Sequence, residues 1–86
     1  MSIKELAKLI PAEYRREILQ LDMISRANAQ GSDPSMLHLA VVWKNYIEPD
    51  FEGGCPLCYS RVLTTFRSMQ DDLIELERNE NLLNQA

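Results

Sequence analysis

The sequence is poor in the residues that build catalytic and metal centres. Among its 86 residues it has one histidine, two cysteines and three glycines. The three glycines form no phosphate-binding loop, so nucleotide binding has no support in the sequence. The one histidine, His38, stands in no serine–histidine–aspartate pattern. We therefore expect a protein that is not an enzyme.

Long apolar runs are also missing. The longest, residues 39–43, falls far short of the roughly 20 residues that a membrane-spanning helix needs. The N-terminus lacks the basic-then-apolar layout of a signal peptide. Two cysteines without such a signal are typical of a reducing compartment. We expect a soluble, intracellular, cytoplasmic protein with no membrane partner, which could also be incorporated in a larger particle.

Positive charge is scarce in one half of the chain. The net charge is −4, and residues 46–86 hold eight acidic residues against three arginines. Residues 1–45 are nearly neutral. Because neutralisation of phosphates supplies most non-specific affinity for nucleic acid, a chain without a basic stripe is not expected to bind DNA or RNA.

The residues that are present indicate one small helical domain over residues 1–86. The chain is 45% hydrophobic and 26% charged, as in ordinary soluble domains. Ser2 and Glu5 form a capping-box pattern that opens a helix over residues 3–9. Pro11, Pro34 and Pro56 each stand where a further helix could begin, since a first helical turn tolerates the missing N–H.

Apolar spacing predicts the extent of the next two helices. The second runs from Ala12 to about Ala29, with Gly31 as its C-terminal stop. The third begins at Pro34, after Asp33 as cap, and continues to residue 47. Residues 1–47 are therefore expected to be a three-helix part, and residues 48–55, which are rich in glycine and proline, a loop ordered by Phe51.

Residues 56–84 are expected to form one long amphipathic helix. Its apolar residues recur at three- and four-residue steps over three to four heptads: Tyr59, Val62, Phe66, Met69, Leu73, Leu76 and Leu83. Such a helix is on the order of 40 Å long, more than the other helices can cover. The predicted fold class is all-α, a small bundle of about four helices with a long C-terminal helix.

The distal part of this helix is the predicted interaction surface. Four leucines are candidates for partner binding: Leu73, Leu76, Leu82 and Leu83. The acidic residues between them, including Glu75 and Glu77, are expected to form the solvated face, with Arg78 giving helix-spaced ion pairs. We expect a homo-oligomer or a protein partner at this surface.

Both cysteines lie in one short motif, Cys55-Pro-Leu-Cys58, between two glycines and the long helix. Two thiols at this spacing provide half of a tetrahedral zinc site. His38 is a lesser candidate for a third ligand, and a second copy of the chain would supply the missing pair. The same motif also fits a redox dithiol, or cysteines that merely begin a helix. No cofactor is certain, and zinc is the one that the motif allows.

Together these features favour a non-enzymatic interaction or assembly protein, such as an accessory component of a larger assembly, including a viral particle. Two alternatives stay open. The second helix, the Gly31 turn and the third helix are spaced as in a helix-turn-helix DNA-binding regulator, although the third helix offers Lys44 and no arginine. A dithiol oxidoreductase is the other alternative.

Overall fold

The structure is a computed structural model that describes residues 2–85, and the side chains of residues 2–81. That part of the chain contains five helices and no strand, which confirms the all-α class. In chain order the helices are α1 (Ile3–Leu9), α2 (Ala12–Gln20), α3 (Met23–Arg26), α4 (Pro34–Tyr46) and α5 (Pro56–Gln85).

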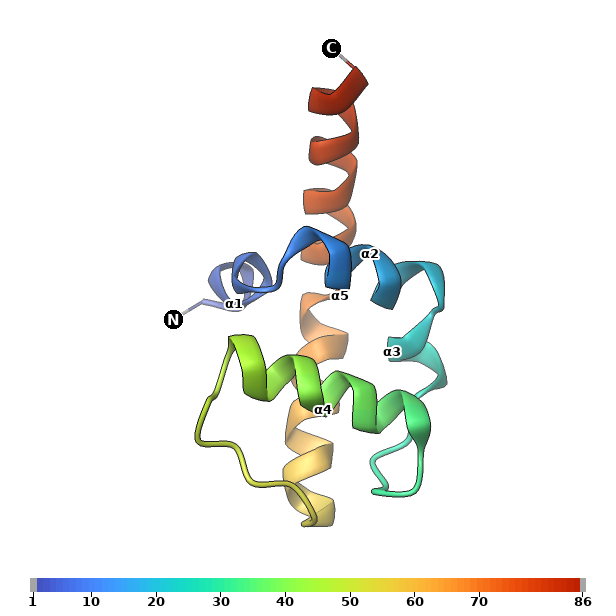
Figure 1. Cartoon of the computed structure of the whole chain (residues 1–86), viewed down its shortest axis with the longest axis vertical. Coiled ribbons are helices and arrows are strands. Elements are labelled where there is room, and N and C mark those ends of the chain that lie inside the picture. Colours follow the sequence, from blue (N-terminus) through green and yellow to red (C-terminus); the bar gives the residue numbers. More distant parts are fainter. Residues whose placement is uncertain (1, 86) are drawn as a thin grey trace.

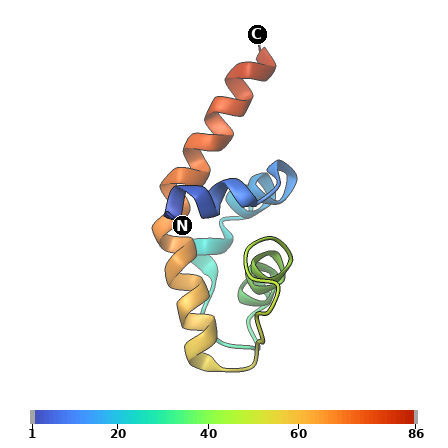
Figure 2. The same cartoon turned by 90° about the vertical axis from the view of Figure 1, so that its left-hand side faces the viewer.

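The longest helix forms the axis of the molecule. α5 has 30 residues, which at about 1.5 Å per residue gives about 45 Å, and the longest dimension of the chain is 44 Å. All four other helices pack against α5, and α2, α3 and α4 lie on one side of it (Figure 2). The core therefore runs along one face of α5.

Local capping explains where the helices begin. The Ser2 hydroxyl accepts a hydrogen bond from the Glu5 N–H at 3.2 Å, as expected for a cap. The Asp33 carboxylate likewise accepts from the Met36 N–H at 3.0 Å, and Pro34 occupies the first turn of α4. The predicted starts at residues 3, 34 and 56 are thus confirmed.

The predicted second helix, from Ala12 to about Ala29, is wrong as a single element. α2 ends at Gln20, and α3 begins at Met23. Between them Asp22 takes a left-handed backbone conformation with φ 53°, which aspartate tolerates better than most residues. This break leaves Leu21 54% exposed and turns Met23 into the core. Gly31 is not a helix stop, because α3 has already ended at Arg26.

The apolar stripe of α5 is the inner wall of the core. Its residues Val62, Phe66, Met69 and Leu73 are fully buried. The Phe66 ring lies against Trp43 of α4, with 6.0 Å between the ring centroids. Most of the predicted heptad stripe is therefore covered by the chain's own helices.

The segment between α4 and α5 is an ordered loop. Phe51 is buried, and its ring meets the Tyr59 ring edge-on at 6.4 Å between centroids. Gly54 has φ +99°, a conformation that glycine adopts without steric cost. A Cβ at Gly53 would lie 2.8 Å from the Tyr59 hydroxyl oxygen. Both glycines are therefore explained by the sharp approach to α5.

Candidate functional site

The most distinctive surface lies at the end of the molecule where α5 begins. We call residues 51–59 the tip; they comprise the end of the loop and the first turn of α5 (Figure 1). The tip carries both cysteines, one side of a pocket, and an exposed leucine.

The two thiols of the tip interact with each other. Cys55 and Cys58 are free and half-buried, and the Cys55 carbonyl accepts the Tyr59 N–H at 3.1 Å as α5 begins. Hydrogen bonds from the Cys58 thiol, and then from the Cys58 backbone N–H, lower the pKa of Cys55. Donation of that thiol proton to Cys55 raises the pKa of Cys58. The first thiol to ionise is therefore Cys55.

Arg61, one turn further along α5, brings positive charge to the thiols. Its guanidinium donates to both carboxylate oxygens of Glu48, at 3.0 and 3.2 Å, and lies 5.9 Å from the centre of the Trp43 ring. The hydrogen bond to Cys55 is the main cause that raises the pKa of Cys58, while the charges of Arg61 and Glu48 act on this pKa in opposite directions. Arg61 and Glu48 are thus an ion pair beside the cysteine pair.

His38 lies elsewhere, on α4, and faces α2. Its Nε2 is 2.7 Å from Oε1 of Glu17, which makes a charged pair whenever the imidazole is protonated. Within the described part of the chain, no group of three or more histidine, cysteine, aspartate or glutamate side chains could hold a metal ion. Cys55 and Cys58 therefore remain two ligands of an incomplete set.

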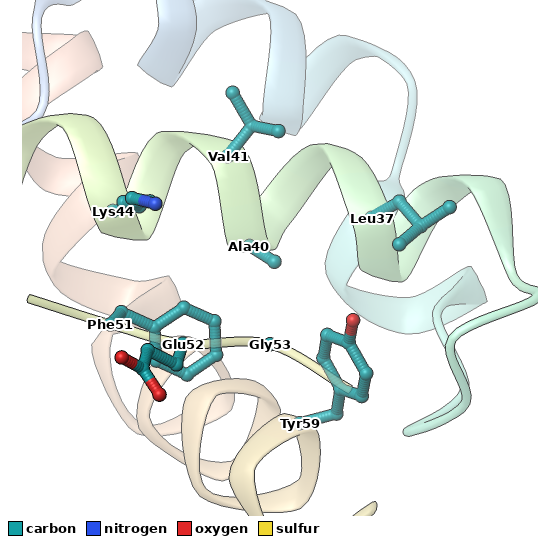
Figure 3. Close-up of a pocket in the computed structure, with 8 residues that line it drawn as sticks. All are labelled: Leu37, Ala40, Val41, Lys44, Phe51, Glu52, Gly53 and Tyr59. Carbon is teal, nitrogen blue, oxygen red and sulfur yellow. The ribbon is translucent and has the colours of Figure 1, made fainter. Parts of the chain in front are cut away.

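An open apolar pocket adjoins the tip (Figure 3). It has a volume of about 420 Å³ and lies between α4 and the residues 51–53 and 59. Its lining consists of Leu37, Ala40, Val41, Lys44, Phe51, Glu52, Gly53 and Tyr59. Leu57, two residues from Tyr59, is 80% exposed. Leu57 is not among the residues that line the pocket.

The predicted partner-binding leucines separate into two groups. Leu73 is 0% exposed, so it is not the surplus apolar residue that the spacing indicated. Leu76 is partly buried against the core, and its role in partner binding stays a prediction. The covering helices reach further along α5 than their lengths suggested. The side chains of Leu82 and Leu83 lie outside the described residues, and their role stays a prediction.

A charged cluster between α2 and α5 was missed by the sequence reasoning. Arg15 pairs with Glu77 and Glu80, and Arg16 pairs with Glu77 at 2.9 Å. Glu77 was expected on the solvated face with Arg78 nearby, and this expectation is corrected. The available signal was Glu80, which occupies an apolar position of the heptad stripe, together with the adjacent arginines Arg15 and Arg16.

These features define a small all-α protein that carries a dithiol and an apolar pocket at one end of a long helix. Comparison with protein-family models, with curated proteins and with solved structures gave no match. None of the helices in residues 2–85 combines the length and the apolar character needed to cross a membrane.

Proposed function

We propose that this chain is a non-enzymatic assembly protein that associates with a second copy, or docks on another protein, through the distal part of α5. One observation carries the proposal: α5 continues beyond α1 and α2, the last helices that pack on it (Figures 1 and 2). A helix end that its own chain leaves uncovered offers its apolar residues to another chain.

The internal contacts of α5 support this reading up to residue 80. Leu76 packs against the core, and Glu77 and Glu80 pair with the arginines of α2. Leu83 follows Leu76 by seven residues, which is one heptad, so the sequence repeats the same stripe past the internal contacts of the described side chains. Leu82 adds a second apolar residue beside it. A coiled-coil contact there fits a cytoplasmic assembly, including a viral particle.

The test is the mass of the full chain in solution, measured by size-exclusion chromatography with light scattering. We expect a mass above the 9.9 kDa of one chain. The double variant Leu82→Asp, Leu83→Asp should return the chain to a monomer. The control, Asn81→Asp with Asn84→Asp, adds the same charge to the same turns without removing apolar side chains and should stay associated.

A monomer at all concentrations contradicts self-association, and equal behaviour of the two double variants contradicts the role of the leucines. Docking on a different protein is then tested with a photo-crosslinking residue at position 82. The helix-turn-helix alternative predicts DNA binding at low salt, which Lys44→Glu should weaken. The oxidoreductase alternative predicts turnover of a disulfide substrate.

A further inference from the structure

We propose that the tip binds one Zn²⁺ ion between two copies of the chain, with Cys55 and Cys58 of each copy as the four ligands. The proposal concerns the opposite end of α5 from the proposed docking surface, and it does not depend on that function. It rests on the donor set of the tip and on its exposed leucine.

Cys55 and Cys58 are suitable zinc ligands, but one copy of the chain supplies only two of the four ligands that a closed site needs. The motif places two free, half-buried thiols three positions apart where α5 begins, and closed zinc sites in proteins take four ligands in a tetrahedron, with Cys₄ a common set. In the described residues no third donor joins the cysteines, and His38 is engaged with Glu17. Two more thiolates must then come from another chain.

A second copy is the simplest source of the missing pair, because a two-fold axis through the metal gives each copy the same surroundings. The tip lies at an end of the molecule, where two copies can approach without a clash between their helices (Figure 1). Leu57, between the two cysteines, is the most exposed large apolar side chain of the described residues, at 80%. In the proposed dimer Leu57 is buried at the interface.

The contact between the two tips depends on the metal. Four thiols lose their protons on binding, so the metal and its ligands carry a net charge of about −2. Arg61 of each copy lies near Cys58 and is itself paired with Glu48. Without the metal no ligand bond joins the two copies, and we expect no tip-to-tip dimer in the apo protein.

The experiment is a titration of the reduced full-length chain with Co²⁺ and then Zn²⁺, followed by absorption spectroscopy and light scattering. We expect the bands of tetrahedral thiolate-bound Co²⁺ to saturate at half an equivalent per chain, together with a doubling of mass. Saturation at one equivalent without a change in mass overturns the shared site, and so does the absence of binding.

Three variants distinguish the proposed zinc site from the proposed docking surface on distal α5. Cys55→Ser with Cys58→Ser should abolish the metal-dependent doubling but leave any association through Leu82 and Leu83 intact. Leu57→Ser should weaken metal-linked dimerisation by at least about tenfold, as expected for losing a buried leucine. Leu21→Ser, which changes an exposed leucine at the end of α2, should bind metal as the unaltered chain does. Equal weakening by both leucine variants would contradict the interface.

Discussion

A single residue, Asp22, determines the path of the chain between α2 and α3. Its φ of 53° is the one positive value among the described non-glycine residues. The following N–H groups of α3 then restart a helical turn that places Met23 and Ile24 in the core.

Asp22→Ile is therefore expected to lower the free energy of unfolding by about 1–2 kcal/mol, because a β-branched side chain is strained in the left-handed region. Asp22→Asn should be nearly neutral, since asparagine tolerates this conformation equally well. Urea denaturation of the three proteins measures the difference. Equal stability of Asp22→Ile and the unaltered chain would show that the break does not depend on this backbone angle.

This residue also marks where prediction from the sequence fails. Ser2, Asp33 and Pro56 were predicted correctly because a cap or a proline acts on the turn beside it. Asp22 favours a turn, but it stands among apolar residues at helical spacing, and this spacing concealed the break. The choice between helix and turn is made by the burial of Met23 and Ile24 in the tertiary structure.

At the scale of elements, α2 and α5 are held together by charge. Arg15 is 7% exposed and meets Glu77 and Glu80 of α5. Arg16 joins the same two carboxylates from the next position. The positive charges of the two arginines equal the negative charges of the two glutamates. The buried guanidinium of Arg15 is therefore neutralised at the point where α5 leaves the core.

Arg15→Ala is expected to cost about 2–4 kcal/mol of unfolding free energy, because removal of one partner leaves carboxylates without their buried counter-charge. Arg78→Ala on the exposed side of α5 should change stability by less than about 0.5 kcal/mol. Thermal and urea denaturation measure both variants. A loss of equal size in the two proteins would contradict the structural role of the cluster.

The pairing of these elements could not be read from the sequence. Arg15 and Glu80 are 65 positions apart, and spacing along one helix contains no information on which other helix lies opposite. The same holds for the pocket at the tip, whose lining comes from α4, the loop and α5. The cysteine motif was recognised because its residues are adjacent, whereas its exposed neighbour Leu57 became apparent only in the folded chain.

At the scale of the whole molecule, two internal carboxylates link stability to pH. The pKa of Glu77 is lowered, first by its hydrogen bond with Arg16, and the pKa of Glu48 is lowered by its hydrogen bonds with Arg61. Both groups bind protons less readily in the folded chain than at the ordinary glutamate pKa of 4.5. Their stabilisation is complete above that value and is lost as the pH falls through the lower, folded pKa.

The midpoint of thermal unfolding should therefore be nearly constant from about pH 7 to about pH 5 and fall as the pH drops below about 4.5. Glu77→Gln should be less stable at neutral pH and should show a shallower decline in acid. Calorimetry across this range provides the measurement. An acid decline that is as steep in Glu77→Gln would place the titrating groups elsewhere.

The position of α5 in the chain also has a consequence for synthesis. Helices α1 to α4 are translated first, yet the surface on which all of them pack comes last. At about 5–20 residues per second, the ribosome needs several seconds to progress from Arg15 to Glu80. During that interval the apolar faces of the N-terminal helices lack α5, the helix against which they pack. The N-terminal helices therefore reach their native packing only after α5 has left the ribosome.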